Sequence, residues 1–295
     1  MRTFFKKVWT FVTAPFRWVA RGFISILEKT FLGDFLVEDP EDTPILDTIQ
    51  KATDEPTDFL NSLLEHLNAL RKHLFRAVAA LIITSIVSFI FITDIMEWLS
   101  QPIGGIEELQ AIEVTESIGV VMRITFLSGF VIALPYICFE ILRFVAPGIS
   151  RKARLTGLFG IPFVGVFFVV GLIFAYEFML DPALDILLNF MEIHTIPRPN
   201  SYFRFVTSLM FWIGVAFEFP LISYVLSSMG ILTSQTLRDH WRLAFILLSI
   251  LAAMITPTID PINMMIVLLP LWSLYGLSIV MASIGHRKPK EFSSE

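Results

Sequence analysis

The stretch HLNALRKHLFRAVAALIITSIVSF, His66 to Phe89, changes character halfway along and thereby decides the fold. Its first half carries basic side chains between leucines, and no Asp, Glu, Lys or Arg occurs from Ala77 to Thr93. A helix takes roughly 20 apolar residues to cross the core of a bilayer. The stretch therefore predicts a transmembrane helix whose beginning is held at a membrane surface by positive charge.

The rest of the chain repeats this pattern. Further runs without those charged residues occupy 124–139, 155–176, 205–237 (interrupted by Glu218 alone), 243–259 and 261–285. Of the 295 residues, 55% are hydrophobic and the mean hydropathy is +0.71, so too little polar chain remains to cover such helices in a soluble protein. We expect an all-α polytopic membrane protein with six transmembrane helices.

Basic residues gather on alternate connections between these runs. They precede the first run, separate the second from the third and the fourth from the fifth, and follow the sixth: Arg71, Lys72, Arg76, Arg143, Arg151, Lys152, Arg154, Arg238, Arg242, Arg287, Lys288 and Lys290. Segment 94–116, in contrast, contains acidic residues and no Lys or Arg. The positive-inside rule places both termini in the cytoplasm, which an even number of spans allows, and we expect a multi-pass protein of the cytoplasmic membrane.

Composition divides the chain into four parts. Residues 1–37 mix basic and aromatic side chains, which is typical of an amphipathic extension on the membrane surface. Residues 38–58 form an acidic, proline-containing linker, residues 59–285 the membrane domain and residues 286–295 a cytoplasmic tail. The extension either adheres to lipid, the interpretation we favour, or docks a partner.

Two stripes of side chains follow the helical repeat just before the first span. Leucines form one stripe, while Glu65, Ala69, Lys72 and Arg76 form the other. The pattern predicts an amphipathic helix on the cytoplasmic surface that bends or continues into the first span. Ala69 is the one residue without a polar group on the second stripe.

A carboxylate interrupts the fourth run, in WIGVAFEFPLISY, Trp212 to Tyr224. Glu218 would be costly to keep charged at membrane depth, so we expect a functional group that is protonated or faces a water-accessible concave surface. Pro220 follows it, and Pro135, Pro162 and Pro270 lie in other runs. Proline removes a backbone donor and kinks helices, which favours a curved bundle over straight rods.

No catalytic set is present. The sequence contains no HExxH, Walker, GxSxG or Cys-pair motif, and its single cysteine, Cys138, lies in an apolar run. His66 and His73 share a helix face but lack the further ligands that a metal site requires. We therefore expect no enzyme, no metal, no cofactor and no nucleic-acid partner.

Several segments together resemble the TatC family, the core subunit of the twin-arginine protein translocase. They occur in order as HLNALRKHL, FVAPGISRKAR, FAYEFMLDPAL, GVAFEFP and AAMITPTIDPIN, and the resemblance covers about residues 60–284. It implies a curved, glove-like bundle of six helices. It also implies a receptor for twin-arginine signal peptides that works with single-span subunits of the TatA and TatB type, and self-association stays open. Together these would move folded proteins using the proton-motive force.

The resemblance assigns roles to particular residues. Leu70 and Arg71 match the HLxELR motif, and Phe144 and Pro147 match the first cytoplasmic loop, so these four are candidates for signal-peptide binding. Glu218 and Pro220 match the intramembrane cavity and partner contact, and Asp260 matches an outer loop.

Two family glutamates are replaced by alanine, Ala69 in the HLxELR motif and Ala153 in the loop. The resemblance implies that these carboxylates would receive the guanidinium groups of the signal, which prefer carboxylate partners. Glu65, one turn before Ala69, and Glu140, just before the loop, are the candidate substitutes.

Two alternatives remain open. The chain could be a diverged relative with an assembly role and weak signal binding. It could also be a proton-coupled small-molecule transporter using Glu218, for which an inverted internal repeat would be expected, and we find no similarity between the first and second three spans.

Overall fold

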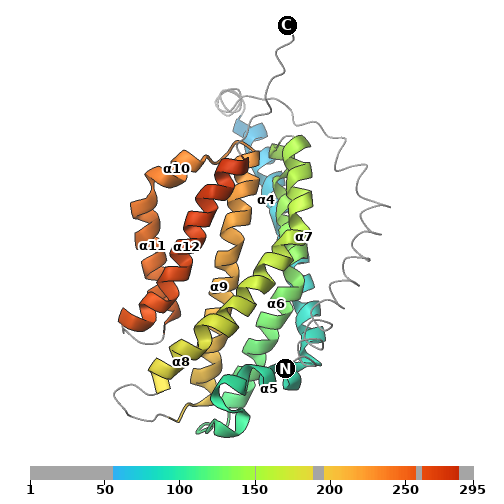
Figure 1. The fold of residues 1–295 in the computed structure, drawn as a ribbon. Helices are drawn as coiled ribbons and strands as arrows, with labels where there is room; N and C mark the ends of the chain where they lie inside the picture. The colour runs from blue at the N-terminus through green and yellow to red at the C-terminus, as the bar shows by residue number, and fades with distance from the viewer. Residues whose placement is uncertain (1–55, 150, 189–195, 257–260, 286–295) are drawn as a thin grey trace.

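The computed structural model describes residues 56–149, 151–188, 196–256 and 261–285, which form helices joined by short turns and loops, with no strand (Figure 1). The predicted extension 1–37, the tail 286–295, most of the linker 38–58, and Asp260 lie outside the described residues.

Five helical segments of the described chain are long and apolar enough to cross a membrane. They are built from α4 (Pro56–Phe89), α6 (Glu116–Val145), α7 (Arg151–Phe174), α9 (Pro199–Ser228) and α12 (Pro261–Gly285). Helix α7 continues through the π-helical turn η4 (Ala175–Leu180) into α8 (Asp181–Leu188). Five of the predicted spans are thereby confirmed.

The span predicted at 243–259 corresponds to α11 (Trp241–Ile255). At 15 residues, α11 reaches about 22 Å, less than the roughly 30 Å of a bilayer core. Six spans therefore remain a prediction. The described chain is completed by short elements: α5 (Ile92–Ser100), η1 (Gln101–Ile103), η2 (Ile106–Glu108), η3 (Ala146–Gly148) and α10 (Ser234–Asp239).

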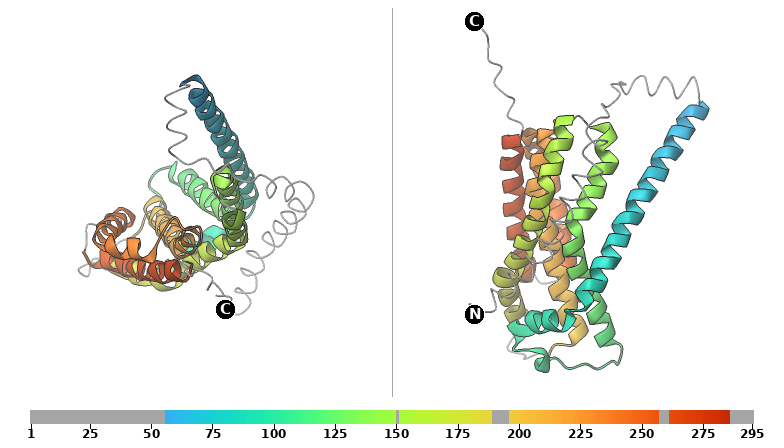
Figure 2. Two further views of the ribbon diagram at one scale, coloured as in Figure 1. Left: turned by 90° about the horizontal axis from the view of Figure 1, so that it is seen from above. Right: turned by 90° about the vertical axis from the view of Figure 1, so that its right-hand side faces the viewer.

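The long helices are arranged along an arc (Figure 2). Contacts join α4 to α6, α6 to both α7 and α9, α9 to α12, and α12 to α11. Helix α4 therefore ends one side of the arc, and α11 ends the other. The curved bundle expected from the sequence is confirmed.

Helix α4 is a single element of 34 residues, about 51 Å long. Of the two alternatives for the amphipathic segment, continuation into the first span is the one found. The first span ends at Phe89 rather than at Thr93, and α5 begins at Ile92. In the right-hand view of Figure 2, α4 leans away from the other helices toward its N-terminal end.

Glycines let the helices cross closely. A Cβ atom on Gly129 of α6 would lie 2.7 Å from the Cα of Ser85 on α4, and the Thr84 hydroxyl donates a hydrogen bond to the Gly129 carbonyl at 2.8 Å. A Cβ atom on Gly171 of α7 would lie 2.8 Å from the Cα of Gly214 on α9. Because lipid offers no hydrophobic drive for helix association, such small-residue crossings hold membrane bundles together.

The prolines in the apolar runs lie inside helices that stay continuous: Pro135 in α6, Pro162 in α7, Pro220 in α9 and Pro270 in α12. Each removes one backbone donor without ending its helix.

Charged segments sort to two ends of the bundle. The beginning of α4, the α6–α7 connection, the α9–α10 connection and the end of α12 lie together at the top of Figure 1. We call this the basic end, and it holds Arg71, Lys72, Arg76, Arg143, Arg151 and Arg238. The acidic segment 94–116 lies at the opposite end, where Tyr202 of α9 donates a hydrogen bond to the Leu99 carbonyl at 2.6 Å.

Candidate functional site

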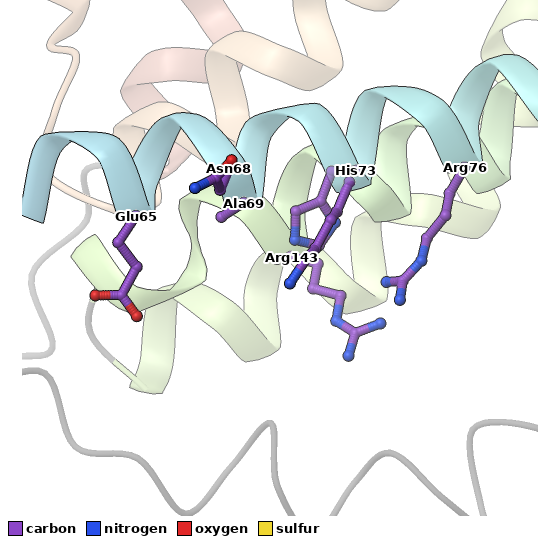
Figure 3. Close-up of a pocket in the computed structure, with 7 residues that line it drawn as sticks. Glu65, Asn68, Ala69, His73, Arg76 and Arg143 are labelled. Carbon is purple, nitrogen blue, oxygen red and sulfur yellow. The ribbon is translucent and has the colours of Figure 1, made fainter. Parts of the chain in front are cut away.

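A cavity of about 430 Å³ lies between α4 and the last turns of α6 at the basic end (Figure 3). It is lined by Glu65, Asn68, Ala69, Lys72, His73, Arg76 and Arg143. Three of these side chains are permanently cationic and one is a carboxylate. The second stripe predicted from the sequence, 65–69–72–76, therefore forms one wall of the cavity.

A polar cluster joins the two helices beside this cavity. His73 Nδ1 lies 2.5 Å from Glu140 Oε2, and the Tyr136 hydroxyl donates to Glu140 Oε1 at 2.7 Å. The rings of His66 and His73 lie 4.6 Å and 6.1 Å from the ring of Phe144. Glu140 is 2% exposed, so its carboxylate is enclosed by partners from its own chain and does not line the cavity.

The predicted signal-binding residues separate into groups. Glu65 lines the cavity, whereas Leu70 and Arg71 are exposed on α4 outside the lining. Phe144 makes a tilted ring contact with His66 of α4, and Pro147 lies in η3 at the α6–α7 connection. The structure thus brings Glu65, Glu140 and Phe144 to one helix pair, and only the first of them faces the open volume.

The two alanines that replace family glutamates differ in their surroundings. Ala69 lines the cavity, but Ala153 is 4% exposed in the first turn of α7. Next to it, the buried Arg154 donates its Nε proton to the Ile149 carbonyl at 3.2 Å, so this guanidinium folds back on the α6–α7 connection. The positive charge beside Ala69 comes instead from Lys72, Arg76 and Arg143.

Glu218 differs from its expected setting. It is 6% exposed, and neither carboxylate oxygen has a hydrogen bond of ordinary geometry with the described residues. Of the two expected settings, protonation and exposure to a concave, water-accessible surface, the second is not the one found in the single chain. The reason is the α7–α9 crossing: Glu218 lies one turn after Gly214, on the face of α9 that Phe168 of α7 covers. Pro220, two positions on, is also buried.

Sequence reasoning missed part of the site. It considered His66 and His73 only as metal ligands, and among the residues that the structure describes no group of three His, Cys, Asp or Glu could hold a metal. The signal was present in the spacing, since Tyr136, Glu140 and Phe144 recur every four residues and so share one face of α6. That face meets the histidine face of α4. No comparable spacing pattern indicated that Asn68 and Arg143 line the cavity.

Comparison with known proteins agrees with this architecture. Residues 65–270 match the family model described as Sec-independent protein translocase protein (TatC). The Sec-independent protein translocase protein TatC of Carboxydothermus hydrogenoformans is 33% identical over 79% of this chain and 97% of its own length, and that of Deinococcus radiodurans is 31% identical over 75% and 86%.

A crystal structure of the twin arginine translocase receptor TatC superimposes with a TM-score of 0.66 at 28% identity, covering 75% of this chain and all of the other. Because the family model spans well over half of the sequence and the relatives match along most of their length, the chain belongs to the TatC family of Sec-independent protein translocases.

Proposed function

We propose that this chain is the signal-receiving core subunit of a twin-arginine translocase in the cytoplasmic membrane. In this arrangement the basic end faces the cytoplasm, both termini lie there, and α11 completes six spans. The sorting of charge to opposite ends of the bundle supports this orientation. The chain would bind twin-arginine signal peptides and move folded proteins with the proton-motive force.

The contact between signal and receptor is assigned to Glu65. The observation that carries the assignment is that Glu65 lines the α4–α6 cavity, while Glu140 is held by His73 and Tyr136. A guanidinium group forms its strongest hydrogen bonds with a carboxylate that is open to it. Glu65 offers such a carboxylate at the position one turn before Ala69.

Single-span subunits of the TatA and TatB type would dock along α9 and the neighbouring helices. Phe219 and Ile222 of α9 are each 49% exposed and flank the buried Glu218 and Pro220. An apolar single-span helix could cover these side chains at membrane depth, where packing and buried polar groups drive association. Lipid would cover the remaining apolar surface.

A second candidate is a diverged family member that supports assembly and binds signals weakly. The excess of cations in the cavity favours it, because Lys72, Arg76 and Arg143 repel an arginine pair. The small-molecule transporter alternative is not pursued, because the family that the chain matches is a protein translocase.

Complementation tests the proposed function. The chain is expressed in a strain that lacks its own TatC subunit, and export of a folded twin-arginine reporter is measured, with a twin-lysine reporter as the control. We expect export of the first reporter alone. No export, together with co-purification of a TatA- or TatB-type subunit, would overturn the receptor role in favour of the assembly role.

A further inference from the structure

The lining of the α4–α6 cavity has an excess of positive charge. Among the described lining residues, Lys72, Arg76 and Arg143 are permanently cationic and Glu65 is the one carboxylate. A volume of about 430 Å³ is far more than the roughly 30 Å³ that one water molecule occupies. The cavity is therefore both large enough and charged in the right sense for an anionic group bigger than a simple ion.

The cations converge from two helices. Lys72 and Arg76 are one turn apart on α4, and Arg143 faces them from α6. In Figure 3 the side chains of Arg76 and Arg143 extend away from their helices in the same direction. Guanidinium forks match phosphate oxygens in pairs, and a lysine ammonium adds a compact point charge.

The same face of α4 becomes apolar farther along the helix. Ile83 and Val87 continue the helical spacing from Arg76 and are 62% and 44% exposed. A ligand that follows this face would place a phosphate among the cations and hydrocarbon along the exposed side chains. That order of groups is the order found in a phospholipid.

We propose that the α4–α6 cavity binds the phosphate of an anionic phospholipid from the leaflet at the basic end. The acyl chains lie along the face of α4 that carries Ile83 and Val87. The bound phosphate brings negative charge next to Ala69, where this chain carries no carboxylate, and so offsets the repulsion between the cavity and an arginine pair. This last role rests on the proposed function, whereas lipid binding itself does not.

Lipid binding is tested on the purified full-length chain in detergent. Phosphatidylglycerol and phosphatidylcholine are titrated separately, and bound lipid is measured by native mass spectrometry. Each of Lys72→Gln, Arg76→Gln and Arg143→Gln is expected to weaken phosphatidylglycerol binding about fivefold, the effect of one surface cation on an anionic lipid. Arg238→Gln removes an exposed cation at the same end but outside the cavity and should leave binding unchanged.

Glu65→Gln is expected to strengthen lipid binding, whereas the cation variants weaken it. Misfolding could weaken binding but could not strengthen it. Removing the one carboxylate among the described lining residues should tighten phosphatidylglycerol binding about fivefold. Equal binding of the two lipids, or equal losses in Arg238→Gln and the cavity variants, would overturn the proposal. So would displacement of bound lipid by millimolar inorganic phosphate, because the site would then recognise a free anion.

The lipid experiment and the export experiment test two independent claims, so either claim can be refuted while the other stands. Selective phosphatidylglycerol binding without reporter export supports the lipid site and removes the receptor function. Export without lipid selectivity supports the receptor function and removes the lipid site.

Discussion

His73 on α4 and Glu140 on α6 are 67 positions apart in the chain, yet their side chains meet at 2.5 Å. The contact closes the inner wall of the α4–α6 cavity and fixes the basic end of α4, the helix at the edge of the arc. It also explains why one of the two candidate carboxylates is not available to a ligand. Glu140 has a structural role, and Glu65 is left as the open acidic group.

Breaking this contact should destabilise the protein. His73→Ala removes one of the two partners of the buried Glu140 carboxylate, and Glu140→Ala removes the shared partner of His73 and Tyr136. Each should lower the free energy of unfolding by about 1–3 kcal/mol. Because the two side chains interact, the double variant should lose less than the sum of the single losses, by at least about 0.5 kcal/mol. Unfolding in detergent measures all three, with Tyr136→Phe as a milder change. Strictly additive losses would show that the contact contributes nothing.

The α4–α6 crossing gives a prediction with a matched control. Gly129→Ala places a Cβ atom 2.7 Å from the Cα of Ser85, so the two helices must move apart, and we expect a loss of about 1–3 kcal/mol in unfolding free energy. Gly119 lies on the same helix with nothing within 4 Å of an added Cβ atom. Gly119→Ala should stabilise α6 slightly, by up to about 1 kcal/mol. Similar effects of the two substitutions would contradict the close crossing.

The sequence predicted what depends on local periodicity and missed what depends on pairing. The charge-free run after Arg76 was enough to predict the first span, and five spans follow from such runs. The span at 243–259 stays a prediction, because the helix found there has 15 residues and ends at Ile255. The burial of Glu218 depends on the glycine crossing of α7 and α9, which brings together residues far apart in sequence. The same holds for Glu140, whose partner is on another helix.

Glu218 is expected to matter for partner assembly rather than for insertion. Glu218→Ala removes a buried carboxylate that has no hydrogen bond of ordinary geometry among the described residues, so the isolated chain should remain inserted and folded. Co-purification of a TatA- or TatB-type subunit and export of the folded reporter should both fall. Phe219→Leu changes apolar packing on the same proposed docking surface but keeps the carboxylate, so its effect on co-purification and export should be smaller. Full export in Glu218→Ala would remove the functional interpretation of this residue.

Glu65 and Glu140 should respond differently to loss of charge. Glu65→Gln is expected to weaken crosslinking of a twin-arginine peptide about two- to fivefold, the range for an exposed ion pair. Glu140→Gln should leave peptide crosslinking nearly unchanged while lowering stability, since its carboxylate is held by His73 and Tyr136. Unchanged crosslinking in both variants would refute the assignment of Glu65, and a loss confined to Glu140→Gln would reverse it.

Ala69→Glu tests the cavity as a whole. The side chain at position 69 lines the cavity, one turn after Glu65 and three residues before Lys72. A glutamate there would be repelled by Glu65 and attracted by Lys72, so the two effects offset each other and α4 should stay intact. The new carboxylate should strengthen twin-arginine peptide binding about two- to fivefold and weaken phosphatidylglycerol binding about fivefold. Ala69→Gln has the same length without the charge and should change neither.

Ala153→Glu provides the contrast, because that position is 4% exposed and a charge there should lower stability without strengthening peptide binding. If Ala69→Glu left both affinities unchanged, the cavity would not be the place where this chain meets either ligand.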